Sequence, residues 1–315
     1  KRRILTIGQK MVSLDVILEE VRGFLQGRVP TAYLVGGYLR DLLLGRETRD
    51  IDILLSQEAM ALARLLADRL EGVFVPLDEE RGIARIVLLR EGGRYRIDIS
   101  QLWGGSLEAD LARRDFTINA LAQDLFHPQT KIVDLCGGEH DLKERRLRAI
   151  SESTFRDDPL RLLRGVRLAG ELGLLVEPHT EELMRRDAPL ITSPSSERVR
   201  DELIKILSLP DSVASLRYLH QLGLLLHIIP ELGDEPLTHS LDAVGALEHL
   251  LTLEGEEAWG SLLLILQRYL GEGTADGGTR FTTLKLAALL HHAGQRKVDV
   301  PPSEGALPIR VIMKR

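Results

Sequence analysis

Two aspartates a residue apart, Asp50 and Asp52, stand inside an otherwise apolar stretch that reads YLVGGYLRDLLLGRETRDIDILL over residues 33–55. Side chains alternate along a β-strand, so both carboxylates share one face while Ile51 and Ile53 point to the other. Carboxylates this close repel each other unless cations lie between them, and oxygen ligands suit Mg²⁺ held together with substrate phosphates. The pattern therefore indicates a divalent-metal site beside a buried core.

A glycine pair, Gly36 and Gly37, follows the apolar run TAYLV and precedes the helical pattern YLRDLLLG. Glycines at this place would let backbone amides approach a phosphate at a helix N-terminus. A glycine pair or two alternating aspartates alone is common by chance. Their order and spacing together favour chemistry on a phosphate.

The elements that must position these residues change in character near residue 150. With 315 residues, 44% of them hydrophobic, the chain is long enough for two or more packed domains. Before residue 150 short apolar runs alternate with helical stretches, and after it helical spacing dominates, which predicts an α+β part followed by an almost all-helical part. The runs that we expect to form strands are TAYLV, IDILL, VFVPL, ARIVLL, YRIDIS and KIVDL.

Composition excludes several other classes. The single cysteine, Cys136, excludes an internal disulfide and argues against a cysteine-based zinc site. No apolar run approaches the roughly 20 residues that a membrane span needs, and residues 1–10 lack the apolar core of a signal peptide. We therefore expect a cytoplasmic protein without a membrane partner. The net charge of −6 argues against wholesale coating of nucleic acid but is compatible with a local basic groove.

The stretch over residues 36–55 resembles the first signature of class II tRNA nucleotidyltransferases and bacterial poly(A) polymerases, in the DNA polymerase β superfamily. The resemblance continues in the family's order with ADLARRDFTINALAQDL, IVDLCGGEHDLKERRLRAI, FRDDPLRLLRGVRLAGELGL and PSSERVRDEL. It implies a polymerase β-like nucleotidyltransferase head with a small mixed or antiparallel sheet over 1–150, and all-α domains after it. These are a helical neck with a nucleotide-template motif over 151–210, and a helical body that binds tRNA over 211–315.

The resemblance also implies nucleotidyl transfer assisted by two Mg²⁺ ions, which can activate the attacking 3′-hydroxyl and neutralise the leaving pyrophosphate. Asp50 and Asp52 fit the metal-binding role. Members of the superfamily often add a third carboxylate from a neighbouring strand, for which Asp98 in YRIDIS is the candidate. The structural alternative is that Asp98 is an ordinary exposed strand aspartate.

By the same resemblance, the residues around Gly36 and Gly37 bind the incoming nucleotide. Arg40 would contact the triphosphate, although an ion pair with its neighbour on the same helical turn is also open. A helix starting near Asp115 would bring Arg114, Asp115 and Asn119 close together. Asp115 could then accept a hydrogen bond from a ribose hydroxyl, or could simply cap the helix.

Asp158 and Arg161 stand three apart on a predicted helix and correspond to the family's protein template for the base. A carboxylate can accept from the exocyclic amine of cytosine or adenine, and an arginine can donate to the adjacent ring acceptors, which predicts CTP and ATP as substrates. The alternative is an intrahelical salt bridge. Arg164 lies on the same face and would reach the triphosphate. The family more often has Glu at Asp157, a departure that bears on base choice.

The motif PSSERVRDEL would start the next helix, with Ser195 or Ser196 capping its free amides. We interpret Glu197, Arg198 and Arg200 as a structural brace for the template helix.

The segment QLWGG alone separates IDIS from SLEADLARRD, where many full CCA-adding enzymes have a longer loop associated with the switch from CTP to ATP. Its shortness favours a CC-adding enzyme over full CCA-adding or A-adding ones. The sequence thus predicts an enzyme that adds C, A or both to the 3′ end of tRNA without a nucleic-acid template. The alternatives are a poly(A) polymerase and, more remotely, an inactive tRNA-binding protein. The oligomeric state is left open.

The stretch LKLAALLHHAGQRK resembles the LAALLHDxGK segment of a metal-dependent phosphohydrolase domain that follows the core in many bacterial members. This chain has His291 and His292 where that domain has His-Asp, and Gln295 where Lys is usual. His239 and His249 fall on a helix that could supply further ligands, but a single histidine on a helical face is usually structural. We expect a degenerate phosphohydrolase-like module that supports tRNA binding.

Overall fold

The computed structural model describes residues 14–90, 93–232, 234–252, 260–274 and 277–293. Gln295 and residues 1–10, which carried expectations from the sequence, lie outside these ranges. The chain divides into two compact units, Lys1–Glu144 and Arg145–Arg315. None of the described helices is long and apolar enough to cross a membrane.

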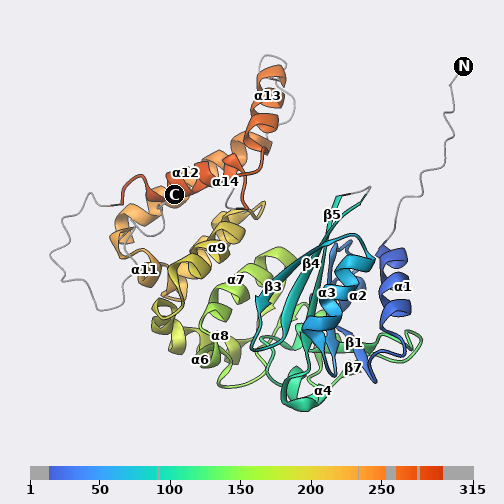
Figure 1. The fold of residues 1–315 in the computed structure, drawn as a ribbon. Helices are drawn as coiled ribbons and strands as arrows, with labels where there is room; N and C mark the ends of the chain where they lie inside the picture. Colours follow the sequence, from blue (N-terminus) through green and yellow to red (C-terminus); the bar gives the residue numbers. More distant parts are fainter. Residues whose placement is uncertain (1–13, 91–92, 233, 253–259, 275–276, 294–315) are drawn as a thin grey trace, which may run out of the picture. The chain divides into compact units, whose positions relative to one another are not determined.

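One mixed sheet of seven strands forms the centre of the first unit (Figure 1). Its order is β3-β4-β5-β2-β1-β6-β7; β2 and β5 run parallel, and all other neighbours run antiparallel. Each of the six predicted strands is present, which confirms the α+β class with a mixed sheet. The strands are β1 (Ala32–Val35), β2 (Asp50–Leu55), β3 (Val73–Asp78), β4 (Ile83–Arg90), β5 (Gly93–Gln101), β6 (Leu121–Asp124) and β7 (Val133–Asp134).

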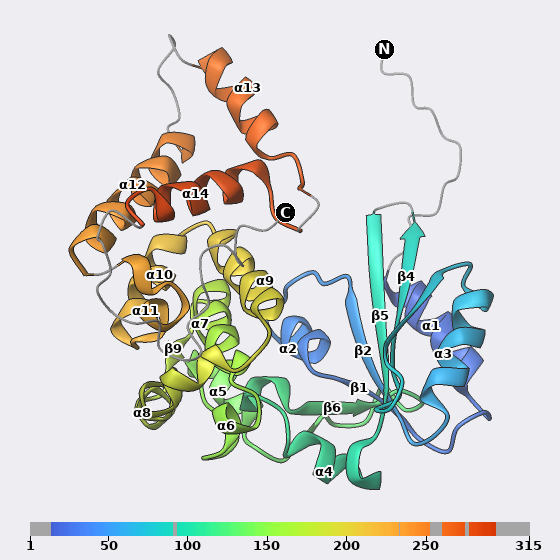
Figure 2. The ribbon, with the colours of Figure 1, turned by 60° about the vertical axis from the view of Figure 1, so that its left-hand side comes forward.

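The helices of the first unit pack on this sheet through apolar stripes. Helix α3 buries Leu62 and Leu66 and contacts β3, β4 and β5, while α1 buries Ile17 and Val21 and lies beside α3 (Figures 1 and 2). Burial of this kind, rather than helix propensity, holds most short helices in proteins. The helices are α1 (Leu14–Leu25), α2 (Gly37–Leu43), α3 (Ala59–Arg69), α4 (Leu107–Leu111) and α5 (Gly138–Lys143), with 3₁₀ turns at Trp103–Gly105 and Thr117–Asn119.

A short 3₁₀ turn, Thr117–Asn119, stands in place of the helix expected to begin near Asp115, so that expectation is wrong. Phe116 is extended, with φ −129° and ψ 151°. The Asp115 Oδ1 atom accepts hydrogen bonds from the Phe116 N–H at 2.8 Å and from Asn119 Nδ2 at 2.9 Å. Local side-chain bonds of this kind compete with a helix, and the chain then enters β6, which pairs with β1.

The described part of the second unit is mostly helical, with two short strands, β8 (Arg146–Leu147) and β9 (Leu175–Val176). Helix α7 packs on α9 and α10, and α12 packs along α14, as Figure 2 shows. The helices are α6 (Thr154–Asp157), α7 (Leu160–Leu172), α8 (Pro178–Asp187), α9 (Ser196–Leu207), α10 (Ser212–Gln221), α11 (Leu224–Ile228), α12 (Asp234–Thr252), α13 (Gly260–Leu270) and α14 (Arg280–Leu290), with 3₁₀ turns at Ala188–Thr192 and Pro230–Leu232.

Asp158 lies in the link between α6 and α7, not on the helix that carries Arg161, which corrects the expectation of one continuous helix. Its backbone is extended, with φ −149° and ψ 100°. The cause is Pro159, because a proline ring disfavours the helical conformation of the residue before it. The two residues remain one turn apart, since the Arg161 N–H donates to the Asp158 carbonyl oxygen at 3.0 Å.

Candidate active site

Three carboxylates gather on one face of the central strands β2 and β5. The parallel register places Asp52 directly opposite Asp98, and Asp50 shares their face two residues earlier on β2. The intervening Ile51 and Ile97 point to the other face and are completely buried. The predicted sharing of a face by Asp50 and Asp52 is therefore present, and the sheet adds Asp98 to them.

The environment of Asp52 disfavours its charged form. Burial is the largest cause, and the negative charge of Asp98 adds to it, so the pKa of Asp52 is raised to about 6. The charge of Arg114 and a hydrogen bond from the Gly37 N–H oppose the rise, while Asp50 increases it. A carboxyl whose pKa is raised by neighbouring carboxylates marks a place where a cation would be stabilised.

Two arginines that sequence reasoning missed neutralise the outer carboxylates. Arg96 donates from Nε and Nη2 to the two oxygens of Asp50, both at 2.6 Å. Arg85 donates in the same way to Asp98, at 2.7 and 2.8 Å. Each arginine lies opposite its aspartate across the sheet, Arg96 on β5 and Arg85 on β4. The alternation of side chains along β4 and β5 places both arginines on the face of the carboxylates, but the sequence does not show which strands are neighbours.

The glycine pair leaves room beside Asp52. Gly36 has φ +67°, and a Cβ there would lie 2.9 Å from Arg114 Nη1 and 3.1 Å from Asp52 Oδ2. Its own N–H donates to the Leu121 carbonyl oxygen at 3.3 Å, and the Gly37 N–H bonds Asp52. In this structure the two amides bond protein groups, and their contact with a phosphate stays a prediction.

A buried relay joins the other predicted nucleotide-binding residues of the first unit. Arg40 donates from Nη1 to Asn119 Oδ1 at 2.9 Å, and Asn119 donates in turn to Asp115. Arg40 also pairs with Asp41 at 2.9 Å, so the ion pair foreseen as its alternative is present as well. Arg114 donates to the Asn119 carbonyl oxygen at 3.4 Å. The expected proximity of these residues holds, although the 3₁₀ turn produces it.

The predicted template residues lie in the second unit, where α9 supports them. Asp158 accepts from the Leu160 N–H at 3.2 Å and from Arg198 Nη2 at 3.0 Å. Arg161, at the start of α7, donates from Nη1 to the Thr154 carbonyl oxygen at 3.2 Å. Arg164 lies one turn further along α7. The contact of Arg198 fits the brace that the sequence suggested.

A contact between α9 and α7 comes from a residue that sequence reasoning missed. Glu202 accepts from Arg167 Nε at 2.9 Å. Burial pushes the pKa of Glu202 up, but the charges of Arg167 and Lys205 outweigh it, so this pKa lies below its ordinary value. By contrast, Arg200 pairs with its neighbour Asp201, at 2.8 Å.

The remaining residues of that motif show no such contact. Glu197 is exposed, and Ser195 occupies the N-cap position of α9 without a capping hydrogen bond from its side chain. The expected serine cap is therefore absent. The role of Glu197, Arg198 and Arg200 as a brace stays a prediction.

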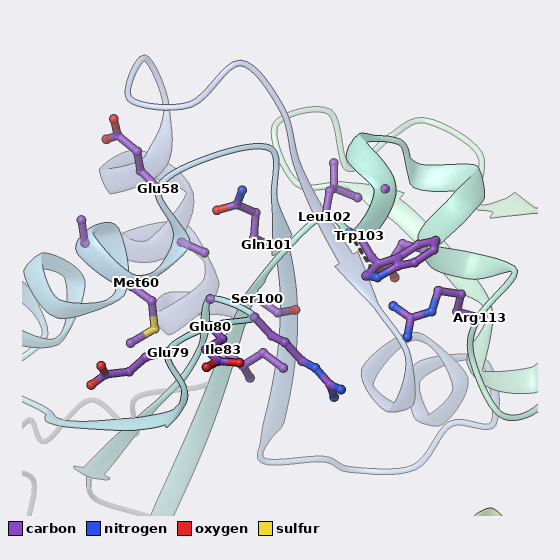
Figure 3. A pocket seen from close by; sticks show the side chains of 16 residues that line it. Glu58, Met60, Glu79, Glu80, Ile83, Ser100, Gln101, Leu102, Trp103 and Arg113 are labelled. Carbon is purple, nitrogen blue, oxygen red and sulfur yellow. Dashed lines mark hydrogen bonds between the residues drawn. The ribbon is translucent and has the colours of Figure 1, made fainter. Parts of the chain in front are cut away.

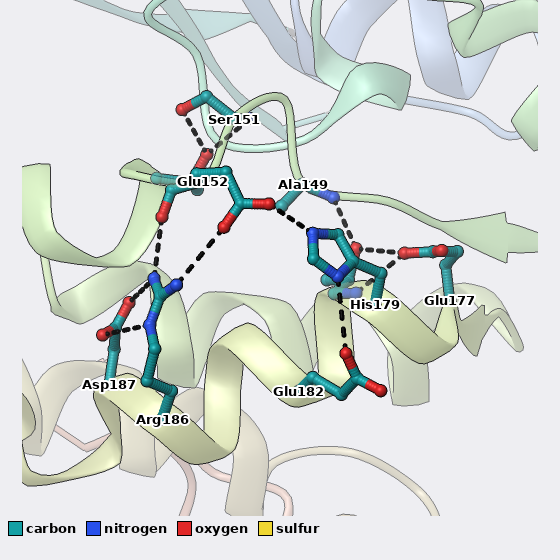
Figure 4. A network of polar contacts seen from close by, with 10 residues as sticks. Ala149, Ser151, Glu152, Glu177, His179, Glu182, Arg186 and Asp187 are labelled. Carbon is teal, nitrogen blue, oxygen red and sulfur yellow. Dashed lines mark hydrogen bonds and ion pairs between the residues drawn. The ribbon is translucent and has the colours of Figure 1, made fainter.

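A polar network holds α8 against the segment that precedes α6 (Figure 4). Glu152 contacts both His179 and Arg186, and Arg186 also pairs with Asp187. The hydrogen bond to Glu152 is the main reason that the pKa of His179 is raised. Hydrogen bonds from Arg186 hold the pKa of Asp187 below its ordinary value. These groups stabilise the second unit and are not among the predicted site residues.

A cavity of about 690 Å³ opens where β5 ends, and the three carboxylates do not line it (Figure 3). Trp103, from the short QLWGG segment, lies on its rim, and Arg113 stacks over the indole at 3.9 Å from the ring centre. The backbone N–H of Trp103 also donates to Asp110 Oδ1 at 3.4 Å. The short segment is thus fixed against α4.

Comparison with known proteins matches two family models. The poly A polymerase head domain matches residues 32–148, and the probable RNA and SrmB-binding site of polymerase A matches residues 173–235. A CC-adding tRNA nucleotidyltransferase of Geobacter sulfurreducens is 39% identical over 265 residues, which cover 84% of this chain and 60% of the relative. An A-adding tRNA nucleotidyltransferase of Deinococcus radiodurans is 40% identical over 252 residues, which cover 74% of this chain and 56% of the relative.

Solved structures agree with these matches. A tRNA nucleotidyltransferase complexed with a primer tRNA and an incoming ATP analog superposes with a TM-score of 0.69 at 26% identity, covering 88% of this chain and 77% of that one. The chain spans only 60%, 51% and 56% of three curated relatives that it matches. The head-domain motifs, the mixed sheet with its three carboxylates and these matches together show that the chain belongs to the class II tRNA nucleotidyltransferase and poly(A) polymerase family.

Proposed function

We propose that this chain adds nucleotides to the 3′ end of tRNA without a nucleic-acid template. The observation that carries the proposal is the carboxylate cluster of Asp50, Asp52 and Asp98 on one face of β2 and β5, inside the part of the chain that matches the head domain. Its named relatives act on tRNA, as CC-adding, A-adding and CCA-adding enzymes, which favours tRNA over poly(A) addition.

The donor set fits a pair of Mg²⁺ ions. All three side chains are carboxylates, which hard divalent cations prefer. Burial and, after it, the charges of Asp98 and Asp50 raise the pKa of Asp52, and a bound cation would offset both effects. Bound to these oxygens, such ions would supply activation of the 3′-hydroxyl and neutralisation of the pyrophosphate. Asp50 and Asp98 would first exchange their contacts with Arg96 and Arg85 for contacts with the cations.

The chain's other residues position the nucleotide. Arg114 lies close enough to Asp52 for its charge to lower the pKa of that carboxyl. Arg114 and Arg40 would supply the positive charge that a triphosphate requires. Asn119 and Asp115 hold Arg40 in place through the relay of hydrogen bonds. The Asp115 carboxylate would accept a hydrogen bond from a ribose hydroxyl of the bound nucleotide.

Base choice would rest on Asp158 and Arg161. Asp158 is oriented by Arg198 and by the Leu160 N–H, so its carboxylate can accept from the exocyclic amine of cytosine or adenine. Arg161, one turn further, would donate to the ring acceptors beside that amine. We propose CTP as the preferred substrate and CC addition as the reaction, because the segment around Trp103 is too short to form the longer loop of full CCA-adding members.

The test is incubation of the full chain with Mg²⁺ and tRNA that lacks the terminal CCA, CA or A, each with CTP, ATP or both. Extension by two C residues supports CC addition. Extension by A alone would instead indicate an A-adding enzyme, and extension by CCA a full CCA-adding enzyme. Long A tails on tRNA and unrelated RNA alike would assign a poly(A) polymerase. Absence of extension under all conditions would favour an inactive tRNA-binding protein. Asp98→Asn should abolish extension, whereas Asp78→Asn, at an aspartate of β3 in the same sheet, should not.

A further inference from the structure

His239 and the adjacent pair His291 and His292 come from distant parts of the sequence. They meet where the start of α12 lies beside the end of α14. The ring centres are 5.3 Å apart for His239 and His291, 4.9 Å for His239 and His292, and 4.0 Å for His291 and His292. One nitrogen from each ring lies within 4.8 Å of the other two. Because Zn–N bonds are about 2.1 Å long, these exposed and half-buried rings would have to rotate slightly toward one another to surround a single ion.

His291 is already oriented for ligation. Its Nδ1 lies 2.6 Å from the Ala288 carbonyl oxygen, and because a carbonyl only accepts, this nitrogen carries the proton. The lone pair is then on Nε2. A ring N–H that donates to a backbone carbonyl is the usual outer contact of a histidine that binds a metal, since it fixes the tautomer and the ring orientation.

The donor set selects the class of ion. The group contains three imidazoles and, among the residues that the structure describes, no carboxylate. Neutral imidazole suits Zn²⁺, Ni²⁺ and Cu²⁺, whereas Mg²⁺ and Ca²⁺ prefer oxygen. The replacement of the expected aspartate by His292 therefore does not remove a ligand; it changes which ion the ligands prefer.

The position of the cluster gives the ion a structural consequence. Near the other end of α12, the buried Lys285 of α14 pairs with Glu248 at 2.6 Å. The histidines lie near the first residues of α12 and just after the last residue of α14. An ion held there would fasten the helix pair at its second end.

We propose that His239, His291 and His292 bind one late first-row divalent ion, with Zn²⁺ as the best fit and water completing its coordination. The site lies outside the nucleotidyltransferase machinery, and the proposal does not depend on the proposed function.

The test uses the full chain, purified without a histidine tag and stripped with a chelator. Titration with Zn²⁺ against a chromophoric chelator should show one equivalent bound, while the same titration with Mg²⁺ should show no competition at this site. His239→Ala, His291→Ala and His292→Ala should each weaken Zn²⁺ binding at least about tenfold, the usual effect of disturbing a ligand or its orientation. His249→Ala, at an exposed histidine of the same helix, is the matched control and should bind as the parent does.

Two further readouts separate a built site from adventitious binding. Co²⁺ should give the intense visible absorption of a four-coordinate site in the parent and lose it in His291→Ala. Zn²⁺ should raise the melting temperature of the parent but not of His239→Ala, because only the parent can join α12 to α14. Binding of less than one equivalent, or equal Zn²⁺ affinity in the parent and the three cluster variants, would overturn the proposal.

Discussion

Asp52 of β2 and Asp98 of β5 face each other across the one parallel strand pair of the described sheet. Their like charges oppose each other, and together with burial they raise the pKa of Asp52 to about 6. A protein that kept these groups for stability alone would do better with one of them neutral. The proposed binding of divalent cations would offset this repulsion, and the cost of the arrangement to the metal-free protein is measurable.

Asp52→Asn should stabilise the metal-free protein above pH 6. A carboxyl whose pKa is higher in the folded protein makes its full contribution to folding stability below its pKa in the unfolded chain, near 4. It loses that contribution as the pH rises through its folded-state pKa of about 6. The shift corresponds to at most about 3 kcal/mol, and because Asp52 is only half-buried, solvent screening reduces it to about 1 kcal/mol. We expect a melting temperature about 2–4 °C higher at pH 8, and no gain at pH 4, in chelator-treated protein.

The same variant should lose nucleotide transfer while its circular dichroism spectrum stays unchanged. Asp78→Asn is the control, because the side chain of this strand aspartate makes polar contacts only with the exposed Arg81 among the residues that the structure describes. Transfer by Asp52→Asn at more than about a tenth of the parent rate, well above the residue left by loss of a catalytic group, would refute the metal-binding role.

Arg161→Ala should relax the choice of base. A good bidentate contact with a base is worth about 1–3 kcal/mol, or roughly 5–150-fold in selectivity, so discrimination against UTP and GTP should fall by that factor along with the rate. The measurement is kcat/KM for the four nucleotides on one tRNA. Arg200→Ala removes an arginine that pairs with its own neighbour and should leave the ratios unchanged. A uniform loss of rate with intact ratios in Arg161→Ala would assign Arg161 to structure or to phosphate binding.

Sequence patterns predicted six of the seven strands of the sheet, because each has a run of apolar and β-branched residues. They missed β6, whose four residues LAQD carry no such run. They failed at Asp115, where local hydrogen bonds and pairing with β1 outweighed a helical spacing. They missed Arg85 and Arg96 because these residues reach their aspartates through strand order, which only the folded sheet defines.

The histidine cluster illustrates the same limit over a longer distance. His239 and His291 lie on different helices, and each taken alone is an unremarkable exposed histidine. Only the packing of α12 along α14 brings them together.

Lys285→Ala should destabilise the second unit strongly. Lys285 is buried, and its Nζ donates to Glu248 Oε1 at 2.6 Å and to the Leu209 carbonyl oxygen at 2.9 Å. Removing one partner of a buried pair leaves the other charge uncompensated, which costs about 3–5 kcal/mol. Urea denaturation should report this loss, and Lys285→Met with Glu248→Gln should recover most of it. The exposed pair between Arg217 of α10 and Asp242 of α12 is the control, because breaking it costs about 1 kcal/mol or less.

The histidine cluster should bind its ion without hydrolysing phosphoesters. Hydrolases of the type that the LKLAALLHHAG stretch resembles hold their ion with an adjacent histidine and aspartate, and here His292 supplies a neutral nitrogen where that carboxylate is expected. The described residues place only histidines in the cluster, so no carboxylate there can share a second cation. Phosphomonoesters and 2′,3′-cyclic phosphates should therefore remain intact in the presence of Mn²⁺, Ni²⁺ or Zn²⁺, measured by release of inorganic phosphate and by opening of the cyclic ester. His292→Asp, which restores the expected pair, is the variant to compare with the parent in the same assay. If the parent hydrolyses either substrate and His291→Ala abolishes that activity, the module is a working hydrolase and the prediction is wrong.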